Sequence, residues 1–135
     1  KIQYHQERVA ERGYSRGCKV RYVWSREIGQ GGRQHYHLLI LVNRDAYYTV
    51  GRLGSERANM ISRIEESWAG ALGVSVDQVD GLLHIPQNAE YRVDRHVRRG
   101  DVDELPVLFH RASYLCKVAT KSFGDRQRGF GASRG

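Results

Sequence analysis

Two strand-like runs joined by a glycine-rich segment constrain the fold of this chain more than any other feature. In CKVRYVWSRE, residues 18–27, apolar and polar side chains alternate, which is the period of a strand with one buried face. The segment IGQGGR, residues 28–33, supplies the glycines of a hairpin turn. The run HYHLLILV, residues 35–42, is apolar on both faces beyond its first residues, which is typical of a central strand. We therefore expect a β-hairpin whose second strand lies inside a sheet.

Helical patterns flank this hairpin. Residues 2–12 predict a short polar helix, and residues 58–72 predict a longer one with an apolar stripe and Gly73 as its C-cap. The segment GLLHIP, residues 81–86, indicates another short strand. A last helix is expected from about residue 103 to residue 119, with Pro106 in its first turn. Its predicted packing stripe is made of apolar side chains, namely Leu105, Leu108, Phe109, Ala112, Leu115, Cys116 and Ala119.

The expected fold class is α+β, because helices and antiparallel strands follow one another in mixed order. A length of 135 residues suits one domain, residues 1–135, and the tail GDRQRGFGASRG is expected to be irregular. Since Lys1 is not a start methionine, we expect a piece excised from a longer protein. The longest apolar run, residues 38–42, is too short to cross a membrane, and no signal-peptide pattern opens the chain. We expect a cytoplasmic protein without a membrane partner.

Positive charge is concentrated at the two ends of the chain. The net charge is +7, and both the first quarter and the last quarter carry an excess of lysine and arginine. Such clusters suit a polyanion, because each cation near a phosphate releases condensed counterions. The alternative is a solvated basic surface without a partner. The two cysteines, Cys18 and Cys116, lie far apart and lack the paired spacing of a zinc site, so we expect both to be reduced.

His35 and His37 open the second strand, and their spacing places both imidazoles on one face, with backbones about 7 Å apart. If the turn is centred on Gly31, Glu27 lies directly across from His35 on that face. A two-residue turn at Gly31 and Gly32 would instead send the carboxylate to the other face, so the register decides the hypothesis. Two histidines and a carboxylate suit a divalent metal ion, Mn²⁺ or Mg²⁺. Two histidines at this spacing without the glutamate are more often structural.

The same donor set also occurs in non-haem iron oxygenases, which usually enclose a small substrate. Lys19 and Arg21 surround the expected face in this chain, and they favour a substrate that carries phosphate.

A second candidate group lies in the segment YLCK, residues 114–117. Tyr114 and Lys117 are one helical turn apart and face away from the apolar stripe, so core packing does not explain the tyrosine. A neutral phenol is a poor nucleophile unless a cation stabilises its phenolate, and Lys117 together with a bound metal ion would do so. The alternative is a surface tyrosine beside a lysine.

Taken together, the HxH pattern on a strand, an acidic residue on the preceding strand and a later helical YxxK resemble the HUH endonucleases. These are metal-dependent nickases of rolling-circle replication, conjugation and some transposition. The segments RYVWSREIGQGGRQHYHLLILVNRDAYYTVG, WAGALGV, GLLHIP, RASYLCK and FGDRQRGFGASRG are similar to the inovirus-type replication proteins of the YagK/YfjJ C-terminal domain family. This likeness covers nearly the whole chain.

The resemblance implies a role for each matching residue. His35 and His37 would be metal ligands, Glu27 the acidic third ligand, Tyr114 the nucleophile and Lys117 the helix lysine. It also implies a central antiparallel sheet akin to the RNA-recognition fold. The chain departs from the pattern in two ways, since Tyr36 replaces an aliphatic residue between the histidines and no motif-bearing first strand precedes Cys18.

The implied activity is the nicking and joining of single-stranded or hairpin DNA through a 5′-phosphotyrosine, which leaves a free 3′-hydroxyl to prime synthesis. Host replication proteins would be further partners. The alternatives are a DNA-binding module or repressor of phage origin that does not cut, and a transposase of the same superfamily. Candidate DNA-binding residues are the cations of the basic ends and one aromatic residue that would stack on a base: Lys19, Arg21, Lys121, Arg126, Arg128 and Phe130.

Overall fold

A computed structural model describes residues 19–29, 31–44, 47, 59–94, 96, 102–116 and 127–134. The chain divides into two compact units, one of residues 1–19 and 43–90 and one of residues 20–42 and 91–135, which we name the helical unit and the sheet unit. The expected polar helix of residues 2–12 and the side chains of both cysteines lie outside the described part. Helices and antiparallel strands occur together, so the predicted α+β class is confirmed.

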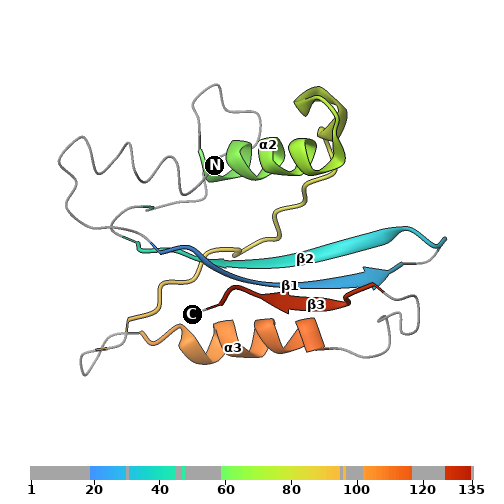
Figure 1. The fold of residues 1–135 in the computed structure, drawn as a ribbon. Coiled ribbons are helices and arrows are strands. Elements are labelled where there is room, and N and C mark those ends of the chain that lie inside the picture. Colours follow the sequence, from blue (N-terminus) through green and yellow to red (C-terminus); the bar gives the residue numbers. More distant parts are fainter. Residues whose placement is uncertain are drawn as a thin grey trace. The chain divides into compact units, whose positions relative to one another are not determined.

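The sheet unit contains three strands in the order β2-β1-β3, all antiparallel to their neighbours (Figure 1). Strand β1 spans Arg21–Ile28, β2 spans Gln34–Leu41 and β3 spans Phe130–Ala132. The second hairpin strand was expected to be central, but among the described residues β2 lies at one edge of the sheet and β1 is the strand with a neighbour on each side. Periodicity reports how apolar a strand is, but it does not report which strands flank it.

Strand β3 comes from the tail that we expected to be irregular, and that expectation was wrong for residues 130–132. Gly131 pairs with Trp24 across the two strands. A Cβ at position 131 would lie 2.5 Å from the indole nitrogen of Trp24, so only a glycine leaves room for the indole ring to lie across β3. The glycines that suggested irregular backbone therefore allow close packing of a large ring against the strand.

The hairpin adopts the register in which Glu27 pairs with His35. Its turn is closed by the amide of Gly29, which donates to the carbonyl of Arg33 at 2.9 Å. Gly31 and Gly32 follow with φ of 91° and 77°, a left-handed region that strongly favours glycine. The turn centred on Gly31 is confirmed, and the alternative that pairs Glu27 with Tyr36 is excluded.

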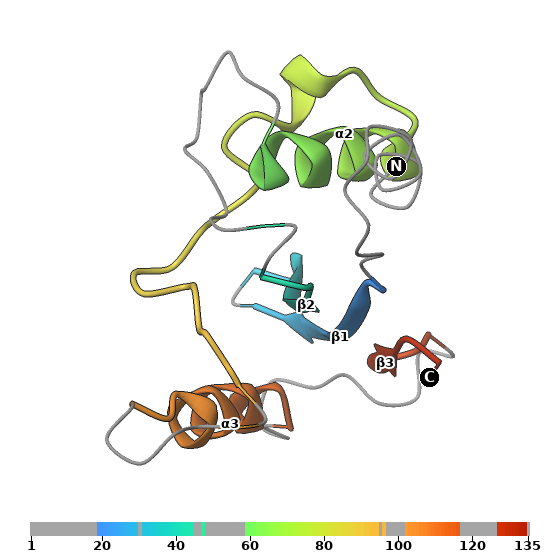
Figure 2. The ribbon, with the colours of Figure 1, turned by 90° about the vertical axis from the view of Figure 1, so that its left-hand side faces the viewer.

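Helix α3, Leu105–Ser113, runs along one face of the sheet, as both views show (Figures 1 and 2). Pro106 lies in its first turn, as predicted. The helix ends earlier than expected and continues as the 3-10 turn η2, Tyr114–Cys116, which contacts β1. The hydroxyl of Ser113 donates to the carbonyl of His110 at 2.6 Å, a local bond that competes with regular helix.

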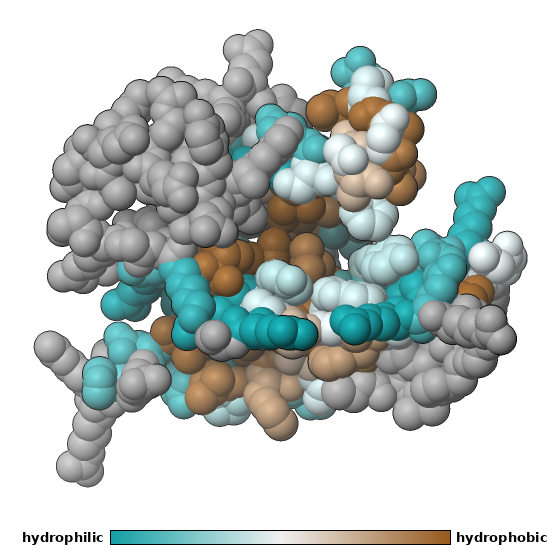
Figure 3. Space-filling model, viewed as in Figure 1, coloured by the Kyte–Doolittle hydropathy of each residue, from teal (hydrophilic) through white to brown (hydrophobic). Residues whose placement is uncertain are grey.

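The apolar stripe predicted for this helix is only partly buried. Leu108 is 8% exposed, whereas Leu105 is 49% and Phe109 74% exposed. Among the described residues of this stripe, only Leu108 is buried. Hydrophilic side chains gather along the sheet on the face shown in Figure 3.

In the helical unit, α2 spans Met60–Leu72 and is followed by the 3-10 turn η1, Val76–Val79. Asn59 and Ser62 form a capping box at its start, and Gly73 is the C-cap with φ of 71°, as predicted. The strand expected at residues 81–86 is absent from this described segment. Gly81 has φ of 73°, which is incompatible with an extended strand.

Candidate functional site

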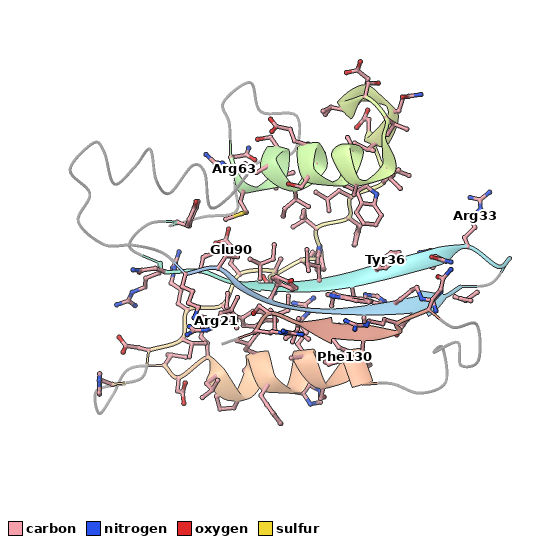
Figure 4. The ribbon with its side chains drawn as sticks, in the orientation of Figure 1. Arg21, Arg33, Tyr36, Arg63, Glu90 and Phe130 are labelled. Atoms are coloured by element: carbon pink, nitrogen blue, oxygen red, sulfur yellow. The ribbon has the colours of Figure 1, made fainter. Side chains whose placement is uncertain are left out.

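The predicted donor residues share one face of the sheet unit. Glu27 pairs with His35, and His37 pairs with Ser25, so alternation along each strand places all four side chains on the same side. Phe130 pairs with Ser25 from the opposite edge and lies on that side too. Figure 4 shows Arg21 and Phe130 on the side of the sheet along which α3 runs. The predicted ligands and Phe130 of the tail therefore lie on the face of the sheet along which α3 runs.

Glu27 and His37 are in direct contact. Oε2 of Glu27 lies 3.1 Å from Nε2 of His37, and the pair is diagonal across the hairpin. The side chain of His37 is 51% exposed and that of Glu27 is 17% exposed, so solvent reaches one member of the pair far more than the other. The carboxylate oxygens of Glu27 and the imidazole nitrogen of His37 are both suitable ligands for a divalent ion.

His35 lies apart from this pair. Its ring packs over Gly29, where a Cβ would be only 2.4 Å from Nε2. Within the described ranges, no three histidine, cysteine or carboxylate side chains lie close enough together to hold a metal ion. The donor types and their common face are those that a divalent cation uses, and the described arrangement brings Glu27 and His37 together without His35.

Tyr114 lies in η2, at the point where α3 ends. Its side chain is 62% exposed, and its ring contacts that of His110 edge to face, with centroids 6.1 Å apart and an interplanar angle of 78°. Because η2 contacts β1, the chain brings this tyrosine to the sheet that carries Glu27. Lys117, the second residue of the predicted pair, lies outside the described residues.

The predicted DNA-binding cations fall into three groups. Arg21 is exposed and shares the face of Glu27, at the opposite end of β1. Arg128 is exposed just before β3, and Arg134, which was not among the predicted residues, is exposed just after it. Lys19 is exposed but belongs to the helical unit. Lys121 and Arg126 lie outside the described residues.

Two buried polar residues of β1 were not identified from the sequence. Ser25 is 0% exposed and its hydroxyl has no hydrogen-bond partner in the described structure. Arg26 is 2% exposed, and its guanidinium donates to the side-chain oxygen of Gln127 at 2.7 Å. The backbone amide of Arg26 also donates to the carbonyl of Gly129 at 2.8 Å. Arg26 thus fixes the approach of the tail to the sheet, and only the pairing of β1 with β3 reveals this role.

These features define an α+β domain in which a β-hairpin and a strand from the tail form one face bearing a carboxylate, two imidazoles and an aromatic ring. The chain belongs to the YagK/YfjJ C-terminal domain family, whose model matches residues 1–133. No solved structure matches it. Within the described residues, no helix is long and apolar enough to cross a membrane.

Two relatives come from Escherichia coli (strain K12). The chain is 37% identical over 122 residues to "Uncharacterized protein YfjJ", an alignment that covers 90% of this chain and 58% of that protein. It is 34% identical over 117 residues to "Uncharacterized protein YagK", covering 87% of this chain and 55% of that protein. The chain thus spans somewhat more than half the length of these relatives.

Proposed function

We propose that this chain is an HUH-type endonuclease domain that nicks and joins single-stranded DNA in a metal-dependent reaction and initiates rolling-circle replication. The observation that carries the proposal is the hairpin register. It pairs Glu27 with His35 and leaves His37 in contact with Glu27, on the sheet whose strand β1 is contacted by η2, the turn that contains Tyr114. This register gathers two imidazoles and one carboxylate on one face of the hairpin, which supports a shared role.

Glu27, His37 and, after rotation, His35 would hold the cation, since carboxylate oxygens and imidazole nitrogens are common ligands of divalent ions. A bound Mn²⁺ or Mg²⁺ supplies Lewis-acid polarisation of a phosphate oxygen. The open side of His37 leaves room for a phosphate to approach. Glu27, the less exposed partner, offsets the positive charge of the ion.

Tyr114 is the proposed nucleophile. Its phenol oxygen forms a bond to phosphorus while the bond from phosphorus to the 3′-oxygen breaks, the phenol loses its proton and the departing 3′-oxygen gains one. The products are a 5′-phosphotyrosine and a free 3′-hydroxyl. Because the phosphodiester energy is kept in the tyrosine link, attack by a 3′-hydroxyl reverses the step and joins the ends. An exposure of 62% gives this side chain access to a large substrate.

The proposed substrate is single-stranded DNA or an extruded hairpin. An unpaired strand can bend so that one phosphate reaches the sheet face, while Arg21 and Arg128 contact its backbone. The high net charge of +7 favours such a polyanion. We infer a cytoplasmic role alongside host replication proteins, and a transposase would share the same chemistry with different DNA partners.

A second candidate is a DNA-binding module or repressor that does not cut. It is favoured by the position of His35, which packs over Gly29 and leaves only two donors in contact. Such a protein would use the basic residues alone and would gain nothing from a metal ion.

The two candidates differ in covalent chemistry. The experiment incubates the protein with Mn²⁺ and end-labelled single-stranded DNA from the element that carries its gene, then looks for an adduct that survives denaturant. We expect an adduct that is lost in Tyr114→Phe and His37→Ala and retained in Tyr22→Phe. Tyr22 is a matched control because it is 42% exposed and lies on the opposite face of β1. An adduct that persists in Tyr114→Phe would move the nucleophile elsewhere, and none in any variant would favour the non-cutting module.

A further inference from the structure

We propose that Phe130 forms a nucleobase subsite beside the cation site, so that the face binds unpaired DNA through stacking of one base. The inference rests on the proposed function for the position of the phosphate. Its starting point is a row of three residues across three strands: His37 on β2 pairs with Ser25 on β1, which pairs with Phe130 on β3. All three side chains are on one face of the sheet.

The row has a dimension that suits one nucleotide. Neighbouring strands are about 4.8 Å apart, so the backbones of His37 and Phe130 are separated by roughly 10 Å. This separation is similar to the distance between a backbone phosphate and a neighbouring base in a DNA strand. A phosphate near His37 and Glu27 would thus leave a base of the same or the next nucleotide over Phe130.

The exposure of Phe130 distinguishes it from the other aromatic side chain at the β1–β3 junction. Trp24, on the opposite face, packs against Gly131 and Tyr36. Phe130 is 50% exposed and lies on the side of the sheet where α3 runs (Figure 4). A ring held by a strand on one side and open on the other is a suitable platform for stacking, because every base presents a flat π-face.

Charge around this ring supports a nucleic-acid strand and not an apolar partner. Arg128 and Arg134 are exposed at the two ends of β3, and no acidic residue lies between them in the sequence. Cations on both sides of an aromatic ring are the combination that tracks a backbone while a base stacks. A paired base is already stacked within its duplex, so this subsite selects unpaired DNA.

The test uses Tyr114→Phe as background, so that binding is measured without cleavage. Single-stranded oligonucleotides that carry one 2-aminopurine report stacking through quenching of its fluorescence. In a second series, one abasic position is moved along the strand and the affinity is measured at each position. We expect Phe130→Leu to weaken binding roughly tenfold and to remove quenching at one position, and Phe130→Trp to retain both. Phe109→Leu is the matched control, since Phe109 is 74% exposed on α3 and should change neither.

Coupling supplies the decisive comparison. The abasic position that lowers affinity when residue 130 is phenylalanine should cause no additional loss of affinity in Phe130→Leu. Duplex DNA of the same sequence should bind both proteins equally. If Phe130→Leu does not fold, the abasic scan on the Phe130 protein decides, and the absence of any sensitive position overturns the subsite.

Equal affinity of Phe130→Leu and Phe109→Leu would also overturn it. If the Phe130→Leu protein that keeps Tyr114 forms the adduct normally and its affinity for DNA is unchanged, the subsite is excluded and the nickase proposal stands. If a base stacks on Phe130 but the protein that keeps Tyr114 forms no adduct, the nickase proposal is excluded and the subsite stands.

Discussion

The ring of His35 occupies the space that a side chain at position 29 would need, because a Cβ on Gly29 would lie 2.4 Å from its Nε2. Gly29 does not adopt a left-handed φ, so alanine fits its backbone and acts only on the ring. The glycine therefore gives His35 a resting place away from Glu27 and His37. This relationship makes the position of the third donor open to direct test.

Gly29→Ala should displace the His35 ring from its resting place and favour the arrangement in which it joins the other donors. We expect Mn²⁺ to bind about two- to tenfold more tightly, since less of the population must rearrange before binding. Isothermal titration or the electron paramagnetic resonance of free Mn²⁺ measures this. Weaker binding would mean that the metal-bound ring also needs the space over Gly29.

Glu27→Gln keeps the shape of the side chain and removes its charge. We expect Mn²⁺ affinity to fall at least roughly tenfold, because a neutral amide is a poor ligand for a hard divalent ion. The thermal midpoint should change little, since a side-chain contact with a half-exposed partner contributes about 0–1 kcal/mol. Calorimetric titration and thermal unfolding report the two effects separately, and a large loss of stability would assign Glu27 a structural role.

Ser25→Ala removes a fully buried hydroxyl that has no hydrogen-bond partner in the described structure. We expect the free energy of unfolding to stay unchanged or rise by about 1 kcal/mol, because the cost of burying an unpaired polar group disappears. Urea unfolding followed by circular dichroism measures it. A clear destabilisation would show that the hydroxyl has a partner, for example a bound water molecule.

Gly131→Ala should destabilise the junction of β1 and β3. The new Cβ would meet the indole of Trp24 at 2.5 Å from its nitrogen, and overpacking of this kind costs about 1–3 kcal/mol. Gly129→Ala is the matched control, because nothing lies within 4 Å of a Cβ there and its φ is not left-handed. Tryptophan fluorescence and the thermal midpoint should shift only in Gly131→Ala, and equal shifts in both variants would contradict the close contact.

DNA affinity should fall steeply as salt is raised, because phosphate contacts release counterions. Arg128→Gln should reduce the slope of log affinity against log salt by about one unit, whereas Arg63→Gln should leave it unchanged. Arg63 is a suitable control because it lies in the helical unit and its guanidinium packs over Tyr47. Fluorescence anisotropy at several salt concentrations gives the slopes, and a flat response would remove the backbone contacts.

The hairpin and its register were predictable because they depend on local signals. Alternating residues set the faces of β1, and the two adjacent glycines after Gly29 set the turn that pairs Glu27 with His35. The cap at Gly73 follows from the same kind of local rule. These predictions needed no information about distant segments.

Long-range pairing was not predictable in the same way. Nothing local to residues 130–132 indicates that they pair with β1, and the burial of Ser25 and Arg26 depends on that pairing. The orientation of the His35 ring was also missed, because register places a residue on a face without choosing its rotamer. The change from α-helix to 3-10 turn after Ser113 was missed too, because apolar periodicity does not mark where a helix changes its hydrogen-bond pattern.

The short strand β3 also shields the outer edge of β1. Without residues 130–132, the amide and carbonyl groups of β1 that now bond to the tail would face solvent as an open strand edge. Such an edge recruits strands from other molecules. Shortening the chain at its tail should therefore reveal itself first as self-association in light scattering, before any loss of helical signal.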